Sequence, residues 1–106
     1  MSGSGPRRIA FCGIDEVTEI AYLSLKEAGL ELVAIFDEES SKKDFLGLEI
    51  LRFDDIKRID PDMIVITSFK ADDELKGALL EAGVDSAKIC SIGSGGWLKK
   101  IEGPAI

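Results

Sequence analysis

Residues 8–37 read RIAFCGIDEVTEIAYLSLKEAGLELVAIFD and carry the clearest structural signal in the chain. Residues 9–12 are a short apolar run that ends at Gly13, which is typical of a strand buried on both faces. Residues 32–36 are a second apolar run, which stops at Asp37. The stretch therefore predicts two strands joined by a crossover.

The segment between these two runs predicts an amphipathic helix. Its apolar side chains recur at helical spacing and are Val17, Ile20, Ala21, Leu25 and Ala28. Asp15 is the expected N-cap of this helix, and Gly29 is the expected stop.

The same alternation continues to the end of the chain. Three further strands are predicted at residues 48–51, 63–67 and 88–92. One or two helical turns are predicted at residues 53–59, and a helix capped by Asp72 follows the fourth strand.

Strands of about five residues that alternate with helices predict an α/β fold with a parallel sheet. We expect a three-layer Rossmann-like domain over residues 8–106, with a five-stranded, mainly parallel sheet in the order 3-2-1-4-5. Residues 9–12 and 63–67 should be its central strands, because both runs are apolar on both faces. Residues 1–7 are interpreted as a flexible leader or an expression remnant, and the domain as one cut from a longer chain.

Composition narrows the function further. The 106 residues suit one domain, and their net charge of -7 makes nucleic acid and anionic membranes poor partners. No apolar run approaches the length of about 20 residues that a membrane helix needs, and no signal peptide is evident, so a cytoplasmic location is expected. Histidine is absent, which removes the commonest general base and metal ligand. We expect no catalytic residue, no metal site, and buried, reduced thiols at Cys12 and Cys90.

In an open α/β sheet, ligands bind at the carboxyl ends of the strands where the strand order reverses. The residues expected to bind a ligand there are Gly13, Ile14, Asp15, Glu16, Asp37, Ser68, Phe69, Lys70 and Ser94. Asp37 follows Gly13 by 24 residues, which is the spacing of the acid that accepts hydrogen bonds from a ribose in dinucleotide-binding folds. Asp15 and Thr18 replace two glycines of that fingerprint, and Asp15 adds negative charge where phosphate would lie.

Each of these signals also has a structural interpretation. Asp15 can be only a cap, and Asp37 only the first acid of a loop. Ser68 and Lys70 fit either a phosphate contact or a solvated turn, and the glycine-rich segment around Ser94 fits either an anion-binding nest or a linker. Trp97 can stack on a base but more often packs against a helix. Tyr22 and Lys26 match a Tyr-x-x-x-Lys pattern, yet they lie mid-helix, where packing of the lysine on the ring is favoured.

The order of IAFCG, EVTEIA, LVAIFDEE, FLGLEIL and DMIVITS resembles a recurring bacterial Rossmann-like domain. It is similar to the N-terminal domains of polysaccharide-biosynthesis sugar dehydratases and sugar acetyltransferases, and to domains attached to winged-helix transcription regulators. Gly13, Asp37 and Gly47 match that pattern, whereas Asp15 and Thr18 depart from it. The resemblance covers about residues 8–92 and implies a sensing or accessory domain more than an enzyme.

The leading hypothesis is a non-catalytic, regulatory module that binds a nucleotide, a dinucleotide such as NAD(P), or a nucleotide-sugar. One alternative is a vestigial domain that serves protein association, as a homodimer or with a fused partner domain. Another is a cofactor-binding fragment of an enzyme that modifies sugar nucleotides.

Overall fold

The computed structural model describes residues 8–93 and 96–98. Its elements in chain order are β1 (Arg8–Cys12), α1 (Thr18–Glu27), β2 (Glu31–Phe36), β3 (Asp44–Phe45), β4 (Leu48–Leu51), η1 (Phe53–Asp55), α2 (Ile56–Ile59), β5 (Met63–Ile66), α3 (Asp72–Glu81), η2 (Ser86–Lys88) and β6 (Ile89–Ser91). The helices labelled η are short 3₁₀ turns.

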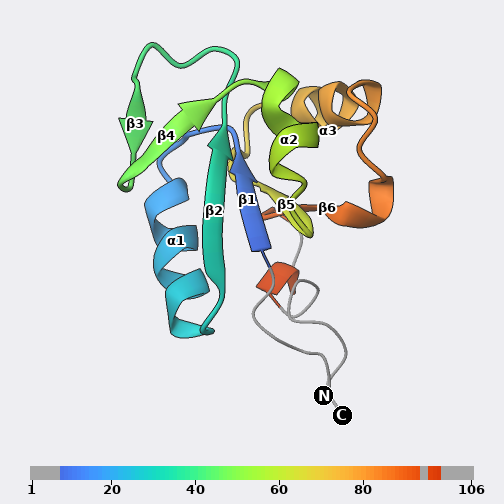
Figure 1. The fold of residues 1–106 in the computed structure, drawn as a ribbon. Helices are drawn as coiled ribbons and strands as arrows, with labels where there is room; N and C mark the ends of the chain where they lie inside the picture. The colour runs from blue at the N-terminus through green and yellow to red at the C-terminus, as the bar shows by residue number, and fades with distance from the viewer. Residues whose placement is uncertain (1–7, 94–95, 99–106) are drawn as a thin grey trace.

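The strands form one sheet in the order β3-β4-β2-β1-β5-β6 (Figure 1). All neighbouring pairs are parallel except β3 and β4, which are antiparallel. The expected α/β class with a mainly parallel sheet is therefore confirmed. The predicted sheet of five strands in the order 3-2-1-4-5 is corrected, because a sixth strand, β3, extends the edge beyond β4.

The extra strand arises from a two-residue hairpin turn. Leu46 and Gly47 connect β3 to β4 with φ angles of 56° and 79°. Two successive positive φ angles are typical of the tight turns that suit twisted hairpins, where asparagine and glycine are preferred. Leucine is unusual in such a conformation, so the sequence carried no hairpin signal at this position.

Strands β1 and β5 are neighbours in the interior of the sheet, as predicted. Phe11 pairs with Val65 in the parallel register, and β2 lies on the other side of β1. Both strands are buried except at Arg8. Cys12 and Cys90 are buried and are not joined by a disulfide, and β5 separates their strands.

Helices cover both faces of the sheet (Figure 1). On one face, Ala10 and Cys12 of β1 belong to a core with Ile56 of α2 and Leu79 of α3. On the other face, Phe11 belongs to a core with residues of α1. This second core also packs against Trp97 and Leu98, which agrees with the packing interpretation of Trp97. The alternation of side chains along β1 thus produces the three layers.

Two predicted helix caps are wrong. The N-cap position of α1 is Val17, and the Asp15 carboxylate accepts a hydrogen bond from the N–H of Glu16 at 2.7 Å instead. Asp72 is already inside α3, and its carboxylate accepts from the hydroxyl of Ser91 on β6. A bond to the next residue at Asp15 and a tertiary contact at Asp72 therefore replace the capping bonds that the sequence suggested.

Element ends also differ slightly from the sequence prediction. Strand β6 begins at Ile89 because Lys88 still belongs to η2, whose N-cap Asp85 accepts from the N–H of Ala87 at 3.0 Å. Helix α2, by contrast, ends at Ile59 as predicted, and the following Asp60 adopts a left-handed conformation with φ 48° immediately before Pro61. Proline disfavours the right-handed α conformation at the preceding residue, so the helix does not continue through Asp60.

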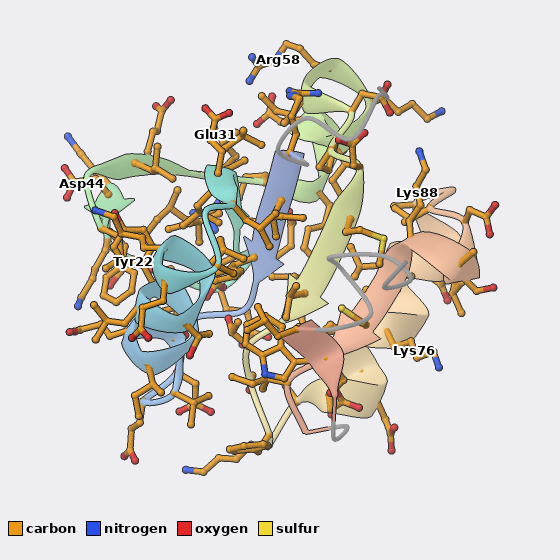
Figure 2. All side chains as sticks on the ribbon, turned by 90° about the horizontal axis from the view of Figure 1, so that it is seen from below. Tyr22, Glu31, Asp44, Arg58, Lys76 and Lys88 are labelled. Atoms are coloured by element: carbon orange, nitrogen blue, oxygen red, sulfur yellow. The ribbon has the colours of Figure 1, made fainter. Side chains whose placement is uncertain are left out.

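Charged side chains lie at the periphery of the molecule. Figure 2 shows Arg58, Lys76 and Lys88 projecting outward from α2, α3 and η2. Within residues 8–93 and 96–98, no helix is long and apolar enough to cross a bilayer.

Gly77 offers a test of helix propensity in α3. It is exposed, and a Cβ atom built there meets nothing within 4 Å. We expect Gly77→Ala to raise the free energy of unfolding by about 0.8–1 kcal/mol, because glycine in a helix interior costs about that much relative to alanine. Urea denaturation of the two proteins measures the difference, and an unchanged or lower midpoint would contradict it.

Candidate functional site

The turn after β1 satisfies its own backbone N–H groups. Gly13 N–H donates to the carbonyl of Phe36 at 2.9 Å. Ile14 N–H donates to the Asp37 carboxylate at 3.0 Å, and Asp15 N–H donates to the Thr18 hydroxyl at 2.8 Å. Glu16 N–H is occupied by Asp15, as described above. Nucleotide-binding turns use such groups to bind phosphate, and here internal acceptors already occupy them.

A buried pair of threonines lies beneath this turn. The Thr67 hydroxyl donates to the carbonyl of Gly13, across the ends of β5 and β1. The Thr18 hydroxyl lies 3.3 Å from both the carbonyl and the hydroxyl oxygen of Thr67, so it can donate to either. Both threonine side chains are fully buried. These contacts fix the start of α1 against the carboxyl end of β5.

Asp37 organises the loop after β2. Its Oδ2 accepts from Ile14 N–H at 3.0 Å, and its Oδ1 accepts from the N–H groups of Glu39 at 2.8 Å and Ser40 at 3.1 Å. The two oxygens of a carboxylate offer about four acceptor positions, so one position on Oδ2 is left for a further donor such as a hydroxyl. The carboxylate thus has a structural role and retains capacity to bind a ligand.

Three more hydrogen bonds fix the conformation of this loop. Glu38 accepts from Phe53 N–H at 2.5 Å through Oε1. The Arg52 guanidinium donates to the backbone carbonyls of Asp37 and Ser40. The loop therefore holds two acidic side chains, those of Asp37 and Glu38, at defined positions over the sheet.

A crevice of about 330 Å³ opens between this loop, the first turn and α3. Its lining residues are Gly13, Ile14, Asp37, Glu38, Glu39, Phe53, Ser68, Ala71, Glu74, Leu75 and Ala78. It lies at the carboxyl ends of β1, β2 and β5, where the predicted strand order led us to expect a ligand. The volume is at the lower end of the range for small-molecule sites, about 300–1,000 Å³.

The lining combines apolar walls with acidic groups. Its larger apolar side chains are those of Ile14, Phe53 and Leu75. Its charged side chains are all carboxylates and are those of Asp37, Glu38, Glu39 and Glu74. An anionic group in the crevice would therefore meet repulsion, whereas a neutral or cationic polar group would not.

The structure brings four of the nine predicted site residues to the crevice. They are Gly13, Ile14, Asp37 and Ser68. Asp15 lies just outside and accepts a hydrogen bond from the Ser68 hydroxyl at 3.2 Å. Glu16, Phe69 and Lys70 are exposed and are absent from the lining. Ser94 lies outside the described residues.

The wall of the crevice that α3 forms was not predicted from the sequence. Ala71, Glu74, Leu75 and Ala78 recur at helical spacing, so they share one face of the helix that follows β5. That spacing was visible in the sequence, but it does not reveal how far the helix leans over the first turn. Phe53 was missed because it belongs to η1, on the far side of the Asp37 loop.

Tyr22 and Lys26 are remote from the crevice. The Lys26 ammonium lies 5.4 Å from the centroid of the Tyr22 ring, which is a cation–π contact along one face of α1. Figure 2 shows Tyr22 near the sheet edge that carries Asp44, away from the carboxyl ends of the central strands. The packing interpretation of this pair is the one the geometry supports.

Burial suppresses the reactivity of Cys12 beneath the crevice. Desolvation, with the negative charges of Asp37 and Glu38, raises the pKa of the Cys12 thiol to about 12. Only the thiolate is nucleophilic, so we expect Cys12 to resist iodoacetamide at pH 8 until the protein unfolds. Alkylation followed by peptide mass spectrometry, with and without urea, measures this, and rapid labelling of the folded protein would contradict it.

The same shift predicts a loss of stability in alkali. From the ordinary pKa of 9.0 up to about 12, the unfolded thiol loses its proton while the folded one retains it, so folding stability falls as pH rises. The slope from this group approaches about 1.4 kcal/mol per pH unit. We expect the free energy of unfolding of the wild type, relative to that of Cys12→Ala, to fall by about 1 kcal/mol between pH 9 and 10. Urea denaturation of both proteins at the two pH values measures this change.

A family model described as C2185-like, N-terminal, matches residues 5–90. Because this match covers most of the 106 residues, the chain belongs to the C2185-like N-terminal domain family. No curated protein matches the chain.

Proposed function

We propose that this C2185-like N-terminal domain is a non-catalytic, regulatory ligand-binding module with a Rossmann-like fold. The nucleoside or sugar part of a nucleotide-type ligand lies in the crevice. The observation that supports this proposal is the position of the crevice at the carboxyl ends of the parallel strands, with Asp37 and Ser68 on its wall. Apart from β3, the strand order β4-β2-β1-β5-β6 agrees with a Rossmann-like arrangement.

Asp37 and Ser68 supply the polar recognition in this proposal. Asp37 retains an acceptor position for a ribose or sugar hydroxyl. The Ser68 hydroxyl donates to Asp15 and accepts from Ala71 N–H, so it retains one acceptor position for a ligand donor. Ile14, Phe53 and Leu75 provide an apolar surface for a base or a sugar face. The first-turn N–H groups are occupied internally, so any phosphates of the ligand lie outside the turn, on the solvent side.

Two variants of α3 test the proposal. Ala78 lines the crevice and is half-buried, so Ala78→Leu fills part of the space that the ligand needs. Gly77→Ala is the matched control, because it changes the adjacent residue on the exposed side. We expect Ala78→Leu to weaken ligand binding at least about tenfold and Gly77→Ala to leave it unchanged.

Titration calorimetry with adenosine, ATP, NAD, NADP and a UDP-sugar provides the measurement. Heat from at least one ligand, abolished by Ala78→Leu, supports the module. No heat from any of them with the wild-type protein overturns the proposal. Equal binding by wild type and Ala78→Leu shows that the ligand lies elsewhere and overturns it as well.

A second candidate function is protein association, because two apolar side chains of α1 lie side by side in solvent. Ile20 and Leu23, one helical turn apart, are 63% and 59% exposed. Paired exposed apolar residues favour a protein contact. A Leu23→Glu variant should then lower the mass measured by sedimentation equilibrium from dimer to monomer. A wild-type protein that is monomeric at all concentrations would exclude self-association.

A further inference from the structure

The negative charge of the crevice indicates which charge its ligand carries, in addition to a nucleoside or sugar part. Four carboxylates line the space, together with apolar side chains, and no lysine or arginine does. Asp37 and Glu38 are fixed by backbone N–H groups, so the negative charge is preorganised on one wall. Glu74 adds charge from α3, on the opposite wall.

Within the described residues, no lysine or arginine forms an ion pair with these carboxylates. Arg52 binds the carbonyls of Asp37 and Ser40 and is outside the lining. The Lys42 ammonium lies 5.5 Å from the centroid of the Phe45 ring. Lys70 is exposed, two residues after Ser68, and is also outside the lining.

The ion pairs of the described residues lie elsewhere. Arg58 pairs with Asp55 at 3.1 Å, and Lys88 pairs with Asp60 at 3.8 Å. None of these four residues lines the crevice. The cavity therefore holds an excess of negative charge that a bound cation can balance.

We infer that the crevice selects a ligand whose nucleoside- or sugar-sized body carries a positively charged amine, over the same body carrying a phosphate. This inference rests on the proposed function and specifies the ligand class of that site. The apolar walls hold the body, and the ammonium group faces Glu38 and Glu74. A phosphate in the same place would meet two like charges instead.

Three ligands that share one body and differ in charge provide the test. They are 5′-amino-5′-deoxyadenosine, adenosine and adenosine 5′-monophosphate, titrated into the whole chain at pH 7 and low salt. We expect the amine to bind about tenfold more tightly than adenosine, and the monophosphate at least about tenfold more weakly. Added salt should narrow both differences, because the carboxylates are largely exposed.

Charge-neutralising variants test the assignment to the crevice. Glutamine keeps a carbonyl oxygen, so Glu38→Gln retains an acceptor for Phe53 N–H while removing the charge. We expect Glu38→Gln and Glu74→Gln each to reduce the ratio of amine affinity to adenosine affinity about threefold. Glu81→Gln is the matched control, since Glu81 lies on α3 outside the lining.

The outcomes distinguish failure of the inferred charge preference from failure of the proposed function. If the monophosphate binds as well as the amine, or if Glu81→Gln acts like the other two variants, the inference fails while the crevice remains a ligand site. If none of the three compounds binds, the inference and the nucleoside form of the proposed function fail together.

Discussion

Gly13→Ala is expected to lower the free energy of unfolding by about 2–4 kcal/mol, the largest effect of any substitution considered. Gly13 has φ +85°, a conformation in which a Cβ atom costs about 1–2 kcal/mol. A Cβ atom built there lies 2.6 Å from Cδ1 of Leu75 and 3.4 Å from Cβ of Ser68. Leu75 must move away, which disturbs the wall of the crevice, so ligand binding should fall with stability.

Gly47→Ala separates the cost of the positive φ angle from the cost of the clash with Leu75. Gly47 has a similar φ of +79°, and a Cβ atom there meets nothing within 4 Å. It should therefore lose only the conformational part, about 1–2 kcal/mol. Urea denaturation of both variants gives the difference, which measures the clash with Leu75. Equal losses for the two variants would show that α3 does not pack on the first turn as described.

Thr67→Val is expected to lower the free energy of unfolding by about 2–3 kcal/mol, although the two side chains have nearly the same shape. The substitution removes the donor to the Gly13 carbonyl and an acceptor of the Thr18 hydroxyl. The Thr18 hydroxyl keeps the Thr67 carbonyl as an acceptor, but the buried Gly13 carbonyl loses its donor, and an unsatisfied buried polar group costs about 1–3 kcal/mol.

Thr67→Ser is the control for this prediction. It keeps the hydroxyl and removes one methyl group, so it should cost only about 1 kcal/mol. Thermal or urea unfolding of the three proteins provides the comparison. A valine variant as stable as the serine variant would show that the hydroxyl does not bridge β5 and the first turn.

The sequence predicted the fold wherever side-chain periodicity and apolar runs agreed. The runs around Phe11 and Val65 are apolar on every residue, so they had to be interior strands, and they are neighbours in the sheet. The edge strand β3 was missed for a physical reason. It has two residues, and Leu46 adopts the left-handed conformation without the glycine or asparagine that would signal it.

The site was predictable where topology alone places residues. Gly13, Asp37 and Ser68 each end or follow a parallel strand, so they converge at one edge of the sheet. Other contacts depend on which partner a side chain meets in three dimensions. The Asp72 carboxylate binds Ser91 of β6 rather than capping its own helix, and no local pattern distinguishes these two outcomes.

The placement of β1 between β2 and β5 has a consequence for how the chain folds during synthesis. The hydrogen bond from Thr67 to Gly13 spans 54 residues of sequence. A growing chain that has reached β4 can pair β1 with β2, but the other edge of β1 stays open until β5 emerges from the ribosome. The crevice needs α3 as well, so a nascent chain acquires its binding wall after its first half is already paired.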